Sequence, residues 1–383
     1  MKGRRILFQD PDPRNLRAAE RALVSTGAEV DIVQVGQLGE LAEVGHVGHA
    51  VAAGGGARFA FAHRDLPAPP SLPDPRALLR RIDEGGYDLV MLNFDPPVRA
   101  DPSWNEVFDR LEARPPPCGV VLHATAASED YLPLLAERRF VRNLIAKNDE
   151  PLDAEELITT AAKLLRGDLF GLDKYLLWGV APLRLEVRDS RKKHETVRAV
   201  AAYAEKLGCG DRTVALVESI ADELITNAIY NAPRDAAGRP RYAAVPRRQP
   251  IVLEPHEVGE LAFGCDGNFL GVSLNDPFGA LTQDTIVAYL NRCLIRVEPL
   301  EASLASSGAG IGLFRIFSSL SKFVVNIEPG RRTEVIALID LRLGMKRFRQ
   351  SPKSFHIFVS SLSSSGSSSG SSSGGTESEV RRG

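Results

Sequence analysis

The stretch that decides the fold of this chain is Ala221-Asp-Glu-Leu-Ile-Thr-Asn-Ala-Ile-Tyr-Asn-Ala232. Glu223, Asn227 and the Tyr230/Asn231 pair recur about one helical turn apart, which places them on one face of a helix. A carboxylate and an amide at this spacing suit a Mg²⁺–phosphate site, because Mg²⁺ prefers hard oxygen ligands and takes few of them from protein. The same pattern is typical of a surface helix with a polar face, so the stretch alone leaves both interpretations open.

Two later stretches favour the phosphate site. The first, Gly271-Val-Ser-Leu-Asn-Asp276-Pro-Phe-Gly279, is a β-like run that ends in an aspartate and a turn. The second, Ser306-Ser-Gly308-Ala-Gly310-Ile-Gly312-Leu313-Phe-Arg-Ile316, is a glycine-rich loop that leads into an apolar helix. Glycines let a backbone approach an anion closely, and the N-terminus of a helix offers free N–H groups to it.

In this order, the three stretches resemble the sequence boxes of the GHKL ATPase superfamily, which includes histidine kinases, anti-sigma-factor serine kinases, gyrase and the heat-shock chaperone ATPase. Residues 223–228 are similar to the N box, and residues 308–313 to the glycine box that closes the phosphate lid. A fourth match is Gly330-Arg-Arg-Thr333-Glu-Val-Ile. Each box alone is a weak signal, but four in the correct order and spacing, over roughly residues 180–342, make a strong one.

The resemblance implies a site for ATP and Mg²⁺. Glu223 would be the catalytic base or the carboxylate that orients water, and Asn227 would hold the Mg²⁺. Asp276 would accept the adenine amino group, and Thr333 would bond near the adenine. The glycines of this nucleotide site would be the one that ends the turn after Asp276 and the three of the glycine box: Gly279, Gly308, Gly310 and Gly312.

This chain departs from the family pattern in two places. Basic or histidine residues that contact phosphates often follow the N-box asparagine, whereas Tyr230 and Asn231 stand here. The Asp-x-Gly-x-Gly motif is reduced to Asp276-Pro-Phe-Gly279. Because phosphoryl transfer depends on positioning and charge neutralisation, the missing cation weighs more against kinase activity than against nucleotide binding. Other candidate cations in this half of the chain are Arg292, Arg296 and Arg315.

The first third of the chain alternates short apolar runs with helical patterns. The predicted strands are residues 5–9, 28–33, 87–93, 119–123 and 144–147. Strands that alternate with helices predict a doubly wound parallel sheet, covered on both faces. Ligand chemistry in such sheets lies at the carboxyl ends of the strands, where Asp10, Asp12, Asp95 and Lys147 fall. Residues 36–75 are rich in Gly, Ala and Pro, and we expect part of them to form a flexible insertion.

This order resembles the flavodoxin-like receiver domain of response regulators, whose phosphorylated aspartate ends the third strand beside an acidic Mg²⁺ pocket and a lysine. Lys147 matches that lysine, but Asn93 stands at the phosphoacceptor position and a proline replaces one residue of the usual acidic pair. Asn93 cannot form an acyl phosphate, and Asp95 could replace it only if the loop shifts. We therefore expect a phosphorylation-independent pseudo-receiver. A compatible alternative is that the aspartates of this region only cap turns.

Length and composition are those of an ordinary globular protein. The 383 residues suggest two or three domains at about 150 residues each. With 44% hydrophobic and 25% charged residues and a formal net charge of −2, nothing favours nucleic acid or membrane as a partner. Four scattered cysteines without zinc spacing, no apolar run of ~20 residues and no signal-peptide core predict a cytoplasmic protein with reduced thiols.

We expect four segments. They are a receiver-like regulatory domain (1–166), a packed junction (167–182), a histidine-kinase-like ATPase domain (183–345) and a tail (346–383) that is Ser/Gly-rich and disordered from about residue 360. The ATPase domain would be an α/β sandwich with a mixed, largely antiparallel sheet. The tail contains one further β-like run, residues 355–359.

The two resemblances together imply a cytoplasmic signal-transduction protein of the two-component or anti-sigma type. It would bind Mg-ATP and phosphorylate a serine or histidine on a signalling partner protein, under the control of its receiver-like domain. The alternative is a non-catalytic adaptor or scaffold that uses ATP only as a conformational ligand. Both interpretations allow a homodimer.

Overall fold

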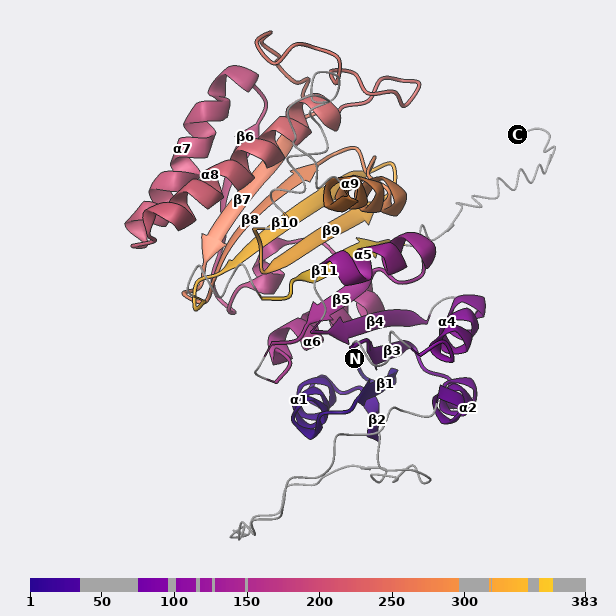
Figure 1. Ribbon diagram of the computed structural model, residues 1–383. Helices are drawn as coiled ribbons and strands as arrows, with labels where there is room; N and C mark the ends of the chain where they lie inside the picture. The colour runs from indigo at the N-terminus through magenta and orange to yellow at the C-terminus, as the bar shows by residue number, and fades with distance from the viewer. Residues whose placement is uncertain are drawn as a thin grey trace, which may run out of the picture.

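The computed structural model describes residues 1–34, 75–95, 101–114, 118–125, 128–148, 151–295, 317, 319–343 and 351–360. One mixed sheet of 11 strands runs through both halves of the chain, with helices on its faces (Figure 1). The strand order is β2-β1-β3-β4-β5-β11-β9-β10-β8-β7-β6. The predicted α/β class is therefore confirmed. Within the described ranges, every helix is too short or too polar to cross a lipid bilayer.

The first five strands are parallel and follow the flavodoxin-like order β2-β1-β3-β4-β5. They are β1 (Arg5–Asp10), β2 (Glu29–Gln34), β3 (Leu89–Asn93), β4 (Gly119–Ala124) and β5 (Asn143–Ala146). Every residue of β3 is buried, as expected for a central parallel strand that is covered on both faces.

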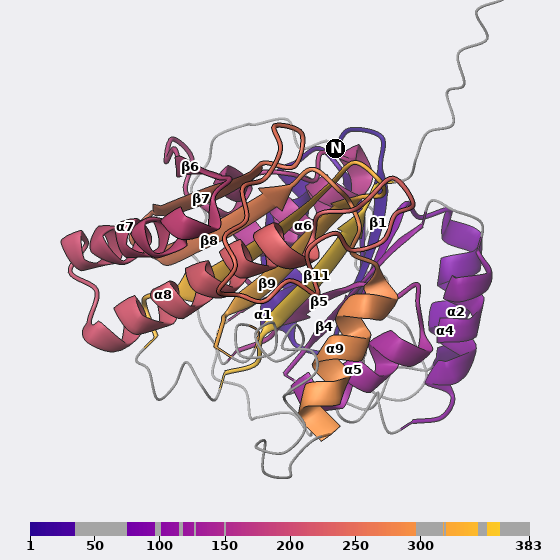
Figure 2. The ribbon, with the colours of Figure 1, turned by 90° about the horizontal axis from the view of Figure 1, so that it is seen from above.

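Helices cover both faces of this parallel part. Helices α1 (Pro13–Val24) and α6 (Ala154–Arg166) pack together on one face. On the other face lie α2 (Pro75–Gly85), α4 (Trp104–Ala113) and α5 (Ser128–Glu137), as Figure 2 shows. The sequence predicts this arrangement because each helix carries one apolar stripe that must be buried against the sheet.

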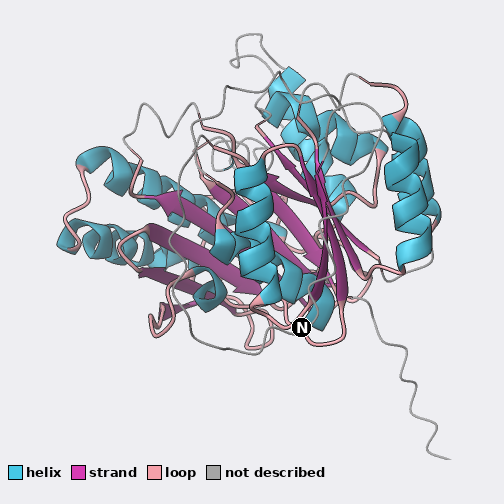
Figure 3. Cartoon of the chain, turned by 90° about the horizontal axis from the view of Figure 1, so that it is seen from below, coloured by secondary structure: helices cyan, strands magenta, loops and turns pink. Residues whose placement is uncertain are grey.

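The second half adds six strands that pair mostly antiparallel. They are β6 (Leu183–Val187), β7 (Gly259–Cys265), β8 (Phe269–Asp276), β9 (Lys322–Glu328), β10 (Arg332–Asp340) and β11 (Ser354–Val359). Helices α7 (Lys193–Lys206) and α8 (Asp211–Thr226) pack side by side over one face, seen from below in Figure 3. Helix α9 (Gln283–Ile295) packs against α5 of the first half.

Strand β11 joins the two halves. It pairs antiparallel with β5 and parallel with β9, so it lies inside the sheet. Its residues are the β-like run of the segment that the sequence suggests as a tail. The carboxyl-terminal part of the chain therefore supplies an internal strand, and the described halves share one sheet.

Charged and polar side chains are buried where the halves meet. The carboxylate of Glu156, on α6, lies 2.8 Å from Lys322 Nζ and 3.1 Å from His356 Nε2, and His356 Nδ1 lies 3.3 Å from Asn143 Oδ1. Lys322 Nζ is also 2.8 Å from Asp153, which caps the N-terminus of α6. Burial raises the pKa of Glu156, but Lys322 and His356 outweigh it and bring the pKa to about 2. We call these five residues the seam cluster.

Replacing Lys322 with Met leaves Glu156 buried without its cation. We expect the free energy of unfolding at pH 7 to fall by about 3 kcal/mol, the usual cost of removing one partner of a buried ion pair. Urea denaturation measures the change. The matched control is Arg331→Met, which removes an exposed pair with Glu328 at the same 2.8 Å and should cost less than about 1 kcal/mol. Equal losses in the two variants would contradict a special contribution from the seam cluster.

Candidate functional site

The first candidate site lies at the carboxyl end of the parallel strands. Asp10 ends β1, Asn93 ends β3, and Lys147 follows β5. The Nζ atom of Lys147 lies 2.9 Å from Asp10 Oδ2, 2.5 Å from Asn93 Oδ1 and 2.6 Å from Asp95 Oδ2. We call these four residues the Lys147 pocket. Each of the three ammonium protons has an acceptor, so the lysine is held in one position.

Asp10 is the buried centre of the Lys147 pocket. Its Oδ1 accepts the backbone N–H of Asp12 at 2.7 Å and Asn15 Nδ2 at 3.2 Å, and His123 Nδ1 lies 3.1 Å from its Oδ2. Burial raises the pKa of Asp10, but His123 and Lys147 outweigh it and hold the pKa below its usual range. Burial lowers the pKa of His123, although the hydrogen bond to Asp10 opposes this shift.

The two other aspartates of this region, Asp12 and Asp95, have different partners. Asp12 is not one of the three acceptors described for Lys147 but caps α1, where its carboxylate accepts the N–H of Arg14 at 2.8 Å and pairs with the Arg14 guanidinium. Asp95 belongs to the pocket: its Oδ1 accepts the N–H of Thr125 at 2.8 Å and lies 3.0 Å from Thr125 Oγ1. Asp10 and Asp12 thus both accept backbone N–H groups of the turn after β1, as the turn-capping alternative expects, and Asp10 and Asp95 in addition neutralise a lysine.

No group of three or more His, Cys, Asp or Glu side chains within the described ranges is arranged to hold a metal ion. In the Lys147 pocket the carboxylate oxygens of Asp10 and Asp95 already have protein partners. Every carboxylate oxygen of the Lys147 pocket therefore has a hydrogen-bond or ion-pair partner within the protein.

The second candidate site lies on the antiparallel half. Asp276 ends β8 and stands directly opposite Thr333 of β10. Cross-strand neighbours project to the same face of a sheet, so the two side chains share one environment. Thr333 is buried, and its Oγ1 has no hydrogen-bond partner among the residues that the structure describes. Asp276 accepts the N–H of Phe278 at 3.0 Å, and burial raises its pKa to about 7.

The turn after Asp276 requires a glycine. Gly279 has a φ of +58°, in the left-handed region that favours glycine. A Cβ atom there would collide with the backbone of the β9–β10 turn, at Glu328 and Gly330. The carbonyl of Gly279 accepts the N–H of Gly330 at 3.2 Å. Gly279 thus holds the end of β8 against the neighbouring turn.

The predicted helical face carries a chain of hydrogen bonds. Asn227 Nδ2 donates to Glu223 Oε1 at 2.9 Å, and Asn231 Nδ2 donates to Asn227 Oδ1 at 2.6 Å. Residues Asn227–Asn231 form a π-helical turn at the end of α8, a feature that is frequent at functional sites. This π-helical turn packs on β8. Ala228 of the turn and the carbonyl group of Asn275 on β8 both lie close to Gly259 of β7. Burial raises the pKa of Glu223. We call Asp276, Thr333, Glu223, Asn227 and Asn231 the Asp276 site.

Two arginines near the Asp276 site do not emerge from the sequence motifs. Arg234 lowers the pKa of Asp276 through its charge, and its Nε is buried with no hydrogen-bond partner in the described part of the chain. Arg247 acts in the same way on Glu223 and lies 4.1 Å above the ring of Tyr230. Both follow the N box in the connection to β7, beyond the positions where the family pattern places a cation.

Other expected site residues lie outside the described residues. These are the three glycines of the glycine box (Gly308, Gly310 and Gly312) and the arginines Arg296 and Arg315. Arg292 belongs to α9, but its side chain is not among those described.

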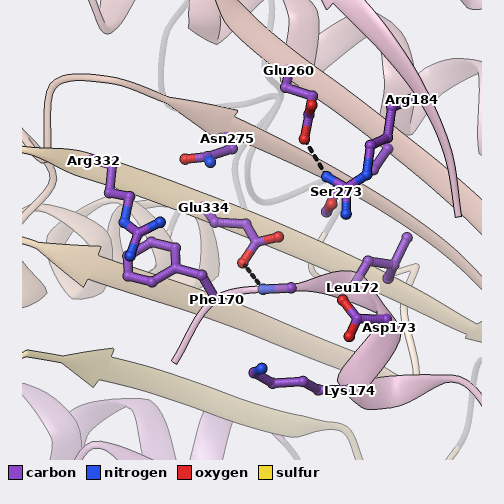
Figure 4. Close-up of a pocket in the computed structure, with 12 residues that line it drawn as sticks. Phe170, Leu172, Asp173, Lys174, Arg184, Glu260, Ser273, Asn275, Arg332 and Glu334 are labelled. Atoms are coloured by element: carbon purple, nitrogen blue, oxygen red, sulfur yellow. Dashed lines mark hydrogen bonds and ion pairs between the residues drawn. The ribbon is translucent and has the colours of Figure 1, made fainter. Parts of the chain in front are cut away.

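A separate cavity of about 270 Å³ lies on the opposite face of the antiparallel half (Figure 4). Glu334, which follows Thr333, points into this cavity and accepts the N–H of Gly171 at 2.9 Å. Arg332 lies 3.7 Å over the ring of Phe170, and Arg184 pairs with Glu260. None of the site residues predicted from the sequence lines this cavity. The alternation of side chains along β8 and β10 separates it from the Asp276 site.

No protein-family model and no curated protein sequence matches the chain. A solved structure of the RcsB response regulator of Salmonella typhimurium is 11% identical, with a TM-score of 0.25, and the match covers 58% of this chain and 91% of that chain. This similarity establishes neither a family nor an activity.

The raised pKa of Asp276 predicts a pH-dependent stability. The pKa is about 7 in the folded protein against 3.8 for an unperturbed aspartate, so the folded state binds the proton more tightly. The stabilisation is complete below pH 4 and is lost as the pH rises through 7. Asp276→Asn removes this loss, so its free energy of unfolding relative to wild type should increase by about 2–3 kcal/mol between pH 5 and pH 8.

Denaturant unfolding at both pH values measures the difference. Asp101→Asn is the matched control, because Asp101 also accepts a backbone N–H group in a turn, but the hydrogen bonds from Ser103 lower its pKa. Its effect should be the same at pH 5 and pH 8. Parallel pH profiles for wild type and Asp276→Asn would contradict the buried, proton-binding carboxyl group.

Proposed function

We propose that the antiparallel half binds Mg-ATP at the Asp276 site, and that the chain is a signalling protein with a GHKL-type ATP-binding half and a receiver-like half. The observation that carries this proposal is the pairing of a carboxyl group whose pKa is raised by burial with a buried hydroxyl group that has no hydrogen-bond partner among the described residues. An unsatisfied buried polar group costs about 1–3 kcal/mol, which a ligand that bonds to it recovers. Adenine offers an amino donor for Asp276 and ring-nitrogen acceptors for Thr333.

The neighbouring ladder of Glu223, Asn227 and Asn231 supports a Mg²⁺–phosphate subsite. One amide and one carboxylate are too few to hold a metal ion alone, but they fit Mg²⁺ that takes its other ligands from phosphates and water. Asn227 Oδ1 would bind the ion, in place of the amide of Asn231 that it now accepts. The bound Mg²⁺ would neutralise phosphate charge.

The same residues allow two outcomes after binding. As an enzyme, the protein would transfer the terminal phosphoryl group of ATP to a serine or histidine of a partner protein and release ADP. The carboxylate of Glu223 would accept the proton that the serine hydroxyl, the histidine imidazole or, in hydrolysis, water loses. Arg234 and Arg247 carry positive charge near Asp276 and Glu223, which supports neutralisation of the phosphates.

The alternative function is a non-catalytic adaptor, and the Lys147 pocket favours it for the first half of the chain. Asn93 stands where a phosphoacceptor is expected, and Lys147 is fully occupied by Asp10, Asn93 and Asp95. A receiver-like half with a saturated pocket would act as a docking module for a signalling partner. In this reading ATP is a conformational ligand.

Calorimetric titration with Mg-ATP tests the binding site. Wild type should bind in the micromolar range, about −8 kcal/mol, and Asp276→Asn should abolish the heat. Thr333→Val should weaken binding about tenfold, because one hydrogen bond is lost. The control is Asn275→Ala, since Asn275 precedes Asp276 but lines the cavity on the opposite face. A folded wild type that releases no heat would remove the ATP-binding proposal.

If ATP binds, the fate of its phosphate separates the enzyme from the adaptor. Phosphate release or transfer that disappears in Glu223→Ala, with binding retained, would support the enzyme. Tight binding without either would support the adaptor.

The Lys147 pocket predicts that radiolabelled acetyl phosphate does not label the protein. Asn93 forms no acyl phosphate, and both oxygens of Asp95 are engaged by Thr125 and Lys147. Acid-stable protein labelling is followed by gel autoradiography after a short quench, with a phosphorylatable receiver protein as positive control. Label that disappears in Asp95→Asn would contradict the pseudo-receiver.

A further inference from the structure

Strand β6 ends the sheet on the side of the antiparallel half. It pairs with β7 along Leu183–Val187, and its other edge meets no strand within the described part of the chain. The backbone N–H and C=O groups along that edge can form a ladder with another strand. Figure 2 shows β6 at this end of the sheet, beyond β7.

Large apolar side chains are exposed in β6 and in the segment that leads into it. Of the six large apolar side chains exposed among the described residues, three lie in or just before β6: Trp178 is fully exposed, Leu183 is 52% exposed and Leu177 is 40% exposed. Exposed apolar side chains on and before a strand with an open edge favour an interaction surface at this end of the sheet.

The sequence of β6 restricts which strand can pair there. Its apolar residues, Leu183, Leu185 and Val187, face the helices, and Arg184 and Glu186 face the opposite side. When two copies of one strand pair antiparallel, the two-fold axis is perpendicular to the sheet and keeps each face on its own side. Apolar residues must then oppose apolar residues, and charged residues must oppose charged ones.

Charge decides between the registers that remain. A pairing centred on Leu185 places Arg184 opposite Glu186 of the second copy, and the symmetry repeats this pair. Centring on Arg184 would oppose two arginines, and centring on Glu186 would oppose two glutamates. Opposite charges across a strand pair stabilise it and like charges destabilise it, so only the Leu185 register is favourable among these three.

A second observation points to the same partner. Within one copy, Glu186 lies opposite Glu260 of β7, which is a pair of like charges. Arg184 is hydrogen-bonded to Glu260, and no ion pair of Glu186 is found in the described residues. Arg184 of a second copy would supply the missing cation. We propose that β6 is the two-fold interface of a homodimer, in which two copies pair antiparallel in register at Leu185 and continue one sheet through both.

This inference is independent of nucleotide binding, and the oligomeric state tests it. In sedimentation-velocity runs the purified full chain should be a dimer at micromolar concentration. Arg184→Glu and Glu186→Arg should each weaken dimerisation by about tenfold or more, because each opposes like charges twice. The double variant should recover the wild-type dissociation constant, since the swapped charges again oppose each other. Circular dichroism verifies that each variant is folded.

A cross-linking pair tests the register. Leu185→Cys lies on the axis and should form a disulfide with its own copy under mild oxidation. Leu183→Cys is the matched control, because it faces Val187 of the second copy and should not cross-link to itself. A wild type that is monomeric throughout the concentration series, a double variant that remains as weak as the single variants, or efficient cross-linking of Leu183→Cys instead of Leu185→Cys would each overturn the proposal.

Discussion

The insertion of β11 between β5 and β9 is the constraint on which the rest of the structure depends. A strand inside a sheet must satisfy backbone groups on both edges, so β11 fixes the register of the parallel half against the antiparallel half. The seam cluster adds a buried ion pair and a buried histidine at the same place. Such pairs contribute little net energy but impose a large penalty on misalignment. The two halves therefore cannot slide along each other without losing both the ladder and the charge compensation.

Successive side chains of a strand point to opposite faces of the sheet, so the antiparallel half has two different polar environments, one on each face. Asp276 and Thr333 face α8, whereas Asn275 and Glu334 face the cavity on the other side. The Lys147 pocket at the parallel half differs from the Asp276 site in one physical respect. Its ammonium group has all its acceptors, and the hydroxyl of Thr333 has none in the described chain. Unsatisfied polar groups are where a ligand gains most, which is why the functional proposal rests on the Asp276 site.

Sequence patterns within single segments predicted part of the fold and of the candidate sites. Apolar runs alternating with helical spacing predicted the α/β class, and the β-like run that ends at Asp276 is strand β8 in the structure. The internal position of β11 could not be predicted, because an apolar run does not say which distant strands it joins. Arg234 and Arg247 reach the Asp276 site through the fold and not through a motif. Asp12 followed by proline carries a helix-capping signal, in agreement with the turn-capping alternative for this aspartate.

Strand β11 also has a consequence for synthesis. On the ribosome, domains form from the N-terminus as the chain emerges, at about 5–20 residues per second. The parallel half is translated long before residues 354–359, which form β11. During the synthesis of β6 to β10, the edge of β5 that later pairs with β11 therefore has no partner strand. A nascent chain in this state exposes a strand edge that invites wrong partners. Because β11 lies between β5 and β9, the two halves of the sheet can pair with it only after nearly the whole described chain has left the ribosome.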